Sequence, residues 1–465
     1  MSIPQTIFIG LRHREQMPAR SGRKKIVILL AVLGLASCDG GSGGGDSARL
    51  PITGSQQVFN DLPQDWVQGD THVHTYISTD AGAESTPAAI RDVGLREGLE
   101  WALMTDHSNA TGSEAYCHGD PVPNDCVEQP ELWNLGPEFP LWDDARTKTD
   151  ATFLLVDGNE ASPVDAIKPP STQLRQPTGH TTVFPKDPDT FDTNWQILDR
   201  PAGSIQGGWA IDEAHAHGAL AFVNHPYSPL NASPWTDFDW SSFDYDGIEV
   251  FNASAQYDIG DIAALDAALC DWSEGHYPAF IGSSDVHRVL VEPPGKLLEP
   301  ALGSARTSVL VPSLEWSNIV AAIEQGHTIA HDKDTFLDMR VTLAGQSHVM
   351  VPGDRQRISS RTQVTVRIGG WSANGGTVRL LAVADGACID HRRDFTASGE
   401  GPGKVELNAE LLAEYTMPIS GPTAVQEFQA TVDVEPGTTL AAVLNPPDAV
   451  LGAFGVALPT PVKLE

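Results

Sequence analysis

Positive charge is scarce in this sequence. Lys and Arg number 29 against 61 Asp and Glu, which gives a formal net charge of -32 at pH 7. Nucleic acids and anionic membrane surfaces are bound largely through Lys and Arg, so neither is an expected partner. The acidity favours solubility and carries no information about the fold.

A hydrophobic run long enough to cross a bilayer is also missing near the N-terminus. The uncharged run at residues 26–35 is too short for a transmembrane helix. It follows Arg20, Arg23, Lys24 and Lys25, and a short apolar run behind basic residues is typical of a secretory signal. The sequence therefore predicts export.

The letters LASC at residues 35–38 close this run and resemble a bacterial lipobox. The resemblance implies that Cys38 is lipidated, with residues 1–38 as the signal and residues 39–60 as a flexible tether. We therefore expect a lipid-anchored protein of the bacterial cell envelope that faces the periplasm, and Asp39 favours the inner membrane. The alternative is a short buried helix followed by an ordinary cysteine.

Cysteine is scarce as well, with 5 in 465 residues. In an oxidising compartment, Cys117 and Cys126 are candidates for a local disulfide in a loop rich in Pro and Asp. Cys270 lies in a helical pattern and Cys388 lies far downstream, so a bond between them would join two domains. Two buried free thiols are the alternative.

No repeat of fixed period is present, and the chain divides instead by its hydrophobic pattern. Between residues 61 and 335, short apolar runs alternate with helical patterns, which predicts an α/β architecture. The apolar runs are WALMT, ATFLLV, HTTVF, ALAFV, GIEVF, AFIGS and TSVLV. Helices are expected to begin at Thr86-Pro87 and to cover residues 314–326. From 336 to 465, runs such as TQVTVRI, TVRLLAV and EFQATVDV predict a separate antiparallel β-sandwich domain.

Side chains that bind metals lie at the ends of these runs. In GDTHVHTYISTD, residues 69–80, His72 and His74 are one residue apart, so in a strand they project to the same side and can hold one ion. Such a pair is weak evidence alone. The later runs add, at one end of each, His107, Glu160, His180, His225, and Asp285 with His287.

This arrangement is typical of an α/β barrel, whose parallel strands gather a site at their carboxyl ends. His180 differs, because it stands at the beginning of its run. A carboxylate can bridge two ions while imidazoles fill the outer positions, and this mixture suits Zn, Mn or Fe better than Ca or Mg. The sequence therefore predicts a site for two or three divalent metal ions.

The ordered motifs DTHVH, MTDHS, GNE, GH, NHP and GSSDVH, within residues 66–335, resemble those of the PHP (polymerase and histidinol phosphatase) superfamily of metal-dependent hydrolases. The resemblance implies a distorted (β/α)7 barrel with a two- or three-metal cluster. Carried onto this sequence, it implies His72, His74, Glu160 and Asp285 for a first ion with Glu160 bridging, His180 and His225 for a second, and Asp80, His107 and His287 for a third. Asp80 departs from those family members that have histidine there.

Three neighbouring residues are expected to support the ligands. Asp70, Asp106 and Asn224 would orient ligating imidazoles, since a ligated histidine usually donates its other N–H to such a group. For Asp106, a cap on the following loop is an equal alternative. Glu249, in DGIEVFN, is expected to be buried and hydrogen-bonded with a mainly structural role, and a catalytic role is the less favoured alternative.

Adjacent divalent ions predict hydrolysis. Water held by such ions becomes hydroxide near neutral pH, and Glu160 and Asp285 would bridge the ions or position the hydroxide. A phosphorus ester benefits most, because its transition state spreads negative charge over several oxygens. The leading hypothesis is therefore a phosphoesterase for a small phosphodiester or phosphomonoester, with Lys168, Arg175 and Arg288 as candidate phosphate contacts.

Two alternatives stay open at this point. The same hydroxide can attack the carbonyl of an ester, amide or carbamate, or the protein is a non-catalytic surface lipoprotein that binds metal or glycans. Insertions at residues 108–150 and 161–179 follow ligand-bearing runs and carry Trp133 and Trp142. Such loops usually form the walls of a barrel's site, so these insertions are expected to shape the substrate pocket.

Overall fold

The computed structural model describes residues 58–59, 65–78, 81–107, 137–161, 179–195, 207–227, 238, 240, 242–252, 257–289, 300–392, 405–445 and 455–465. The expected signal, the lipobox with Cys38, and Asp80, Cys117, Cys126, Trp133, Lys168 and Arg175 all lie outside these residues. No helix in the described part of the chain is long and apolar enough to span a bilayer.

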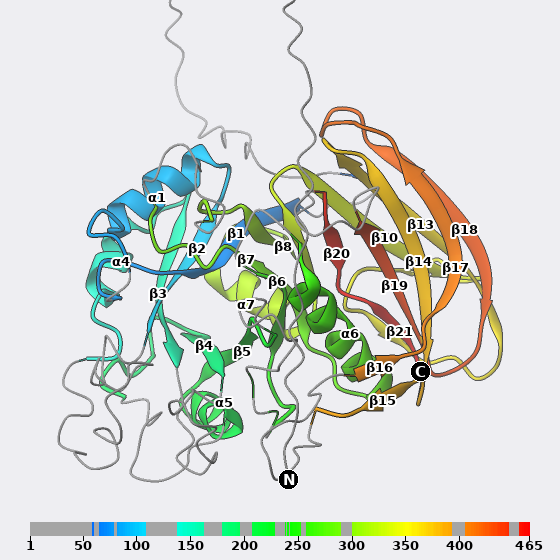
Figure 1. Ribbon diagram of the computed structural model, residues 1–465, viewed down its shortest axis with the longest axis horizontal. Coiled ribbons are helices and arrows are strands. Elements are labelled where there is room, and N and C mark those ends of the chain that lie inside the picture. Colours follow the sequence, from blue (N-terminus) through cyan, green and yellow to red (C-terminus); the bar gives the residue numbers. More distant parts are fainter. Residues whose placement is uncertain are drawn as a thin grey trace, which may run out of the picture. The chain divides into compact units, whose positions relative to one another are not determined.

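The described helices and strands are labelled in Figure 1. The helices are α1 (Pro87–Arg96), α4 (Trp142–Lys148), α5 (Gly207–Ala216), α6 (Ile259–Glu274) and α7 (Trp316–Glu324). The first strands are β1 (Asp65–Val73), β2 (Trp101–His107), β3 (Leu154–Ala161), β4 (His180–Pro185), β5 (Ala219–Asn224), β6 (Gly247–Asn252), β7 (Ala279–Ser283), β8 (Ala305–Val311) and β9 (Thr328–Asp332). All seven apolar runs named above form strands among these.

Strand β4 is reversed relative to the parallel strands on either side of it. The order runs β9-β8-β1-β2-β3-β4-β5-β6-β7. The pairs β1–β2, β2–β3, β5–β6 and β6–β7 are parallel, whereas β4 is antiparallel to both of its neighbours. Because β4 runs backwards, its first residue lies at the edge where the parallel strands end. This reversal explains why His180 stands at the beginning of its run.

The predicted (β/α)7 barrel is not confirmed. In that fold each strand runs parallel to its neighbours, but here β4, β8 and β9 pair in antiparallel fashion. The sheet curls until β7 meets β8, where Thr307 Oγ1 bonds the backbone N and O of Gly282 at 2.9 and 2.8 Å. A Cβ on Gly282 would lie 2.5 Å from the Arg306 oxygen, so this close approach requires glycine. The coarser prediction of a mixed α/β fold stands.

The apolar core of this region lies toward the starts of the parallel strands. Val67, Trp101 and Leu154, near the beginnings of β1, β2 and β3, pack with Ile319 and Ile323 of α7 in one buried cluster. The opposite, carboxyl ends of these strands carry the polar residues. Core packing thus fixes the strands and leaves their far ends free to carry chemistry.

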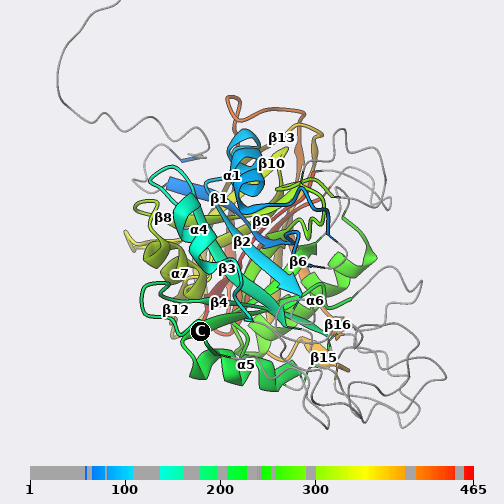
Figure 2. The same cartoon turned by 90° about the vertical axis from the view of Figure 1, so that its left-hand side faces the viewer.

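Local sequence explains where two helices begin. The Thr86 side chain accepts a hydrogen bond from the Ala89 N–H, and Pro87 occupies the first turn of α1, as expected from Thr86-Pro87. In α6, Asp258 and Asp261 cap the first turn reciprocally. Figure 2 shows α1 and α4 beside β2 and β3.

The C-terminal part consists mainly of antiparallel strands in two layers, with one parallel pair. The strands are β10 (Thr335–Leu343), β11 (Val349–Met350), β12 (Arg355–Gln356), β13 (Thr362–Ser372), β14 (Gly376–Ala384), β15 (Cys388–Asp390), β16 (Val405–Leu407), β17 (Glu410–Met417), β18 (Gln426–Val434), β19 (Thr438–Asn445), β20 (Ala457–Pro459) and β21 (Val462–Leu464). One sheet has the order β11-β10-β13-β18. Its side chains, such as Met339 and Val366, pack against Leu380 and Leu444 of β14 and β19.

The second layer is not a separate sheet. Strand β20 pairs with β9 and with β19, so β19, β14 and β17 continue the sheet that contains β1–β9. An independent C-terminal sandwich was expected, and the structure differs in this continuity. The proposed boundary between residues 335 and 336 stays a prediction.

A disulfide and a buried arginine join α6 to the strand pair β15–β16. Cys270 and Cys388 are disulfide-bonded across 118 residues of sequence, which decides against two free thiols. Arg392 donates to Asp271 Oδ1 at 2.6 Å and lies 4.7 Å from the Trp240 ring centroid. Figure 1 shows β15 and β16 beside α6. The junction therefore combines a covalent bond with a buried ion pair.

Replacing Cys270 and Cys388 together by alanine should lower the free energy of unfolding by roughly 2–5 kcal/mol, because the bond restricts a long loop in the unfolded chain. Urea denaturation of the oxidised protein and of the variant measures the difference. Each single replacement should lose about as much as the double, since either one breaks the bond. Equal unfolding midpoints in all four proteins would contradict this account.

Candidate metal centre

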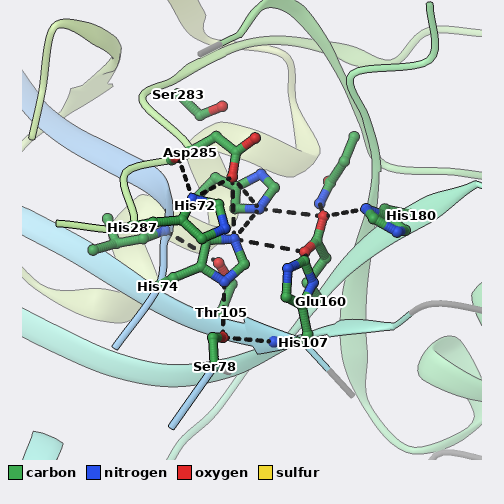
Figure 3. Close-up of polar contacts among 12 residues, drawn as sticks. His72, His74, Ser78, Thr105, His107, Glu160, His180, Ser283, Asp285 and His287 are labelled. Carbon is green, nitrogen blue, oxygen red and sulfur yellow. Dashed lines mark hydrogen bonds and ion pairs between the residues drawn. The ribbon is translucent and has the colours of Figure 1, made fainter. Parts of the chain in front are cut away.

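The predicted ligands gather at one edge of the sheet, where the parallel strands end and β4 begins. His107 ends β2, Glu160 is the penultimate residue of β3, and His180 begins β4. Figure 3 shows these side chains turned toward a common centre. The residues whose ligand atoms meet there are His72, His74, His107, Glu160, His180, His225, Asp285 and His287. Of the nine predicted ligands, only Asp80 is missing from this set, because it lies outside the described residues.

Irregular backbone aims several of these side chains. Between Asp70 and Val73, β1 advances three residues while its partner β2 advances two. The extra residue makes a β-bulge in β1 next to His72. His225 and Asp285 have φ angles of 22° and 51°, in a region that non-glycine residues seldom occupy. Such backbone costs about 1–3 kcal/mol per residue and persists where surrounding contacts hold it. Both residues are predicted ligands, so the strain lies at the site.

The group predicted for a first ion converges closely. His72 Nε2 and His74 Nε2 are 3.1 Å apart. His72 Nε2 lies 3.3 Å from Glu160 Oε1, and His74 Nε2 lies 3.6 Å from Glu160 Oε2. Asp285 Oδ1 lies 3.4 Å from His72 Nε2 and 3.1 Å from His74 Nε2. Two imidazoles and two carboxylates thus face one small volume.

The Glu160 carboxylate also contacts histidines that are predicted for the second and third ions. Its Oε1 lies 2.8 Å from His180 Nδ1 and 3.2 Å from His225 Nε2, the pair predicted for a second ion. Its Oε2 lies 2.5 Å from His107 Nδ1. His107 was expected at a third position only, yet it reaches the Glu160 carboxylate because β2 and β3 pair in register, with His107 opposite Glu160. His107 therefore lies between the second and third positions.

The third predicted position is partly described. The rings of His74 and His287 stack with centroids 4.0 Å apart, and His74, His107 and His287 form one of the groups able to share an ion. His287 Nδ1 lies 3.0 Å from the Asp285 carbonyl oxygen. A carbonyl can only accept, so the hydrogen sits on Nδ1 and Nε2 offers its lone pair.

Hydrogen bonds also fix the tautomer of His74. The Ser78 hydroxyl donates its one hydrogen to Asp106 Oδ1 at 2.7 Å. At His74 Nδ1, 3.0 Å away, the Ser78 oxygen must therefore accept. His74 consequently carries its hydrogen on Nδ1 and offers Nε2 as a ligand. Asp106 also accepts from the Thr75 N–H at 2.7 Å, so it caps the loop after β1 and orients an imidazole through Ser78. The loop that follows Asp106 lies outside the described residues.

Asp70 and Asn224 act differently from the prediction that they orient imidazoles. Asp70 accepts from the backbone N–H groups of His72, Ser284 and Gly303 at 3.3, 3.0 and 2.9 Å. It is fully buried where β1 meets the segments around β7 and β8, which raises its pKa, and besides these backbone groups the Ser284 side chain is a hydrogen-bond partner that lowers it. Asn224 donates to Glu160 Oε1 at 3.2 Å, so it positions the carboxylate instead.

Two contributors were missed by sequence reasoning. Ser78 offered no signal, since nothing in a loop sequence marks a serine that turns back to a histidine four residues earlier. Glu249, expected to be mainly structural, lies 2.9 Å from His72 Nδ1 through its Oε1. A charged residue within the buried strand GIEVFN was the available signal.

The two carboxylates are held in the ionised form that metals require. Burial alone raises a carboxyl pKa, but His180 and His72 hold the pKa of Glu160 well below its usual range. His72 and His74 do the same for the pKa of Asp285. Deprotonated carboxylates are therefore ready as ligands.

The histidines divide into two kinds. Burial, together with His287 and His107, lowers the pKa of His74 to about 3. His225 is buried too, yet its hydrogen bond to Glu160 and the charge of Asp285 raise its pKa to about 9. The cluster of carboxylates thus attracts positive charge.

The residues present fit divalent metal ions. The ligand atoms of each group of three lie within 4.8 Å of one another. Three of these groups combine imidazole nitrogen with carboxylate oxygen, and the fourth, His74, His107 and His287, is all imidazole. This donor set suits Zn, Mn or Fe. Hydrogen bonds leave the Nε2 atoms of His74 and His287 unprotonated, as ligation requires.

No protein-family model and no curated protein matches this chain. Solved structures show similarity. A two-domain protein from Bacteroides vulgatus ATCC 8482, described as containing a predicted PHP-like metal-dependent phosphoesterase, is 15% identical with a TM-score of 0.41 over 90% of this chain and 100% of that one. Endonuclease Q bound to a 27-mer DNA duplex with an abasic lesion is 14% identical with a TM-score of 0.33 over 56% of each chain. The Pyrococcus furiosus enzyme is 12% identical with a TM-score of 0.32 over 56% of each chain.

The description of the Bacteroides vulgatus structure names PHP, the superfamily whose motifs this sequence resembles. The DNA duplex belongs to Endonuclease Q, and it runs against the expectation that nucleic acid is no partner of such a site. At TM-scores below 0.5, these likenesses carry no argument about activity. The chemistry of this chain is argued from its own side chains.

Replacing Glu160 by glutamine should remove more than one metal ion per chain, because imidazoles of different predicted positions meet its two oxygens. Elemental analysis of the purified variant and wild type measures this loss. The control is Glu100→Gln, a buried carboxylate that accepts from the Gln68 N–H and touches no predicted ligand. An unchanged metal content in the Glu160 variant would show that Glu160 is not the bridge.

Proposed function

We propose that this protein is a metal-dependent phosphoesterase that hydrolyses a small phosphodiester or phosphomonoester. The observation that carries the proposal is the convergence of imidazoles on both oxygens of one buried carboxylate, Glu160, beside a second carboxylate, Asp285. When bound, two or three divalent ions supply Lewis-acid activation of water and neutralise charge on the substrate. Glu160 and the surrounding histidines would hold these ions.

The predicted ligands include fully buried side chains and partly exposed ones. The side chains of His72, His74 and Glu160 are 0% exposed. Those of Asp285, His225 and His287 are 18, 24 and 29% exposed. Substrate therefore approaches beside Asp285, which can orient an attacking water. His225 and His287 flank this approach and can contact substrate oxygens.

A phosphorus ester suits this site best for an electrostatic reason. The transition state of phosphoryl transfer spreads negative charge over several oxygens, and several adjacent cations can contact them together. Attack on a carbonyl develops charge on one oxygen and uses a multi-ion site less fully. The geometry therefore favours phosphate esters over carboxyl esters, amides or carbamates.

Steady-state turnover by the metal-loaded protein tests this proposal. Chromogenic phosphodiester, phosphomonoester and carboxyl ester substrates are compared, and phosphate esters should be turned over fastest. Asp285→Asn should lower kcat by at least about 100-fold, because it removes the charge of a predicted ligand and the group that orients the water. Asp338→Asn, a buried carboxylate that accepts from Trp66 Nε1, serves as the control.

Turnover of carboxyl esters alone would replace the proposal with the carbonyl hydrolase. No turnover of any substrate, with metals bound, would favour a non-catalytic binding protein. A duplex DNA with an abasic site belongs in the same panel, and we expect no cleavage because the chain carries a net charge of -32.

We further propose that the protein is lipid-anchored through Cys38 and faces the periplasm. The Cys270–Cys388 disulfide supports export, because such bonds persist in oxidising compartments. A Cys38→Ser variant should lose a fatty-acid label and keep its N-terminal signal, as judged by labelling and intact mass. Labelling equal to that of the wild type would exclude Cys38 as the anchor.

A further inference from the structure

Glu249 is a buried carboxylate beside the site that is hydrogen-bonded through both oxygens. Its side chain is 1% exposed. Oε1 lies 2.9 Å from His72 Nδ1 and accepts from Ser283 Oγ at 2.6 Å. Oε2 accepts from the His225 N–H at 2.8 Å and from Asn252 Nδ2 at 2.6 Å. Each oxygen thus has two partners, and the partners reach two different predicted ligands.

The first consequence concerns His72. A carboxylate has no hydrogen to donate, so the hydrogen of this contact sits on His72 Nδ1. Nε2 then carries the lone pair, and this atom faces His74, Glu160 and Asp285. The Glu249 contact therefore selects the ligating tautomer of His72.

The second consequence concerns His225. Its backbone has a φ angle of 22°, which is costly for a residue with a side chain. The bond from its N–H to Glu249 Oε2 holds that conformation, and the ring then meets Glu160 Oε1 at 3.2 Å. The same carboxylate thereby sets a ring orientation at one position and a backbone conformation at another.

We propose that Glu249 is a positioning residue that couples the first and second ion positions, by fixing the His72 tautomer and the His225 backbone together. This inference rests on the proposed metal-dependent function. It replaces the expectation that Glu249 is mainly structural. The four bonds leave the carboxylate no freedom to act as a ligand itself, so it works only through His72 and His225.

Glu249→Gln provides a specific test, because it keeps the shape and replaces one acceptor oxygen by an NH2 group. The His225 N–H can only donate, so the amide oxygen must take the Oε2 place. The NH2 group then faces His72 Nδ1 and Ser283 Oγ. The Ser283 hydroxyl can rotate so that its oxygen accepts a hydrogen bond from this NH2 group. His72 Nδ1 can accept one only if the hydrogen of His72 moves to Nε2. His72 would then lose its lone pair toward the ion.

Zinc affinity is measured by chelator competition on the metal-stripped full chain. Glu249→Gln should weaken one zinc site about 10–100-fold and leave a second nearly unchanged, because its contact to His225 survives. Glu249→Ala should weaken both. The matched control is Asp332→Asn, a buried carboxylate that accepts from the backbone of Gly455 and Val456 and touches no predicted ligand.

A spectroscopic readout separates positioning from general destabilisation. In protein labelled with 15N-histidine, at a zinc concentration that fills the site only in the wild type, the His72 signal, assigned with a His72→Gln variant, should show hydrogen on Nδ1 in the wild type and on Nε2 in Glu249→Gln, where His72 no longer ligates zinc. Wild-type zinc affinity in Glu249→Gln, a loss matched by Asp332→Asn, or an unchanged tautomer would overturn the inference. Zinc binding without turnover in the wild type would contradict the phosphoesterase instead, and the affinity ratio would still decide the role of Glu249.

Discussion

The burial of the Glu160 carboxylate is the constraint on which the site depends. A buried charge is unfavourable unless opposite charges or donors surround it, and Glu160 is 0% exposed. Histidines from β2, β4 and the end of β5 meet its two oxygens, and Asn224 adds an amide donor. Strand order and direction bring these groups together, because the reversed β4 delivers its first residue to the edge where its neighbours end. The order and direction of the strands therefore determine which groups surround the Glu160 carboxylate.

The sequence predicted seven strands from short, mostly apolar runs, because such runs report burial directly. It predicted the ligand set because a metal site needs particular side chains at strand ends. The direction of β4 was not predicted, although His180 at the start of its run carried that information. The reason is that hydrophobic pattern reports which residues are buried, and strand direction depends on how the connections cross.

The supporting contacts were predictable only in part. Asp106 reaches His74 through Ser78, and Asp70 binds backbone N–H groups, so both depend on distances of a few ångströms that spacing does not encode. For Glu249, the sequence showed the residue but not its contacts. A charged residue in a buried strand was visible in the sequence, but its partners come from β1, β7 and the end of β5, which lie far apart along the chain.

The sheet that passes from β9 through β20 into β19 also bears on modularity. A domain that can be cut away leaves no unpaired strand behind, whereas removal of the chain after β9 would leave one edge of β9 without a hydrogen-bonding neighbour. Exposed edges of this kind recruit other strands and promote aggregation. The C-terminal region therefore covers one edge of the sheet that carries the predicted ligands, and its removal would expose that edge.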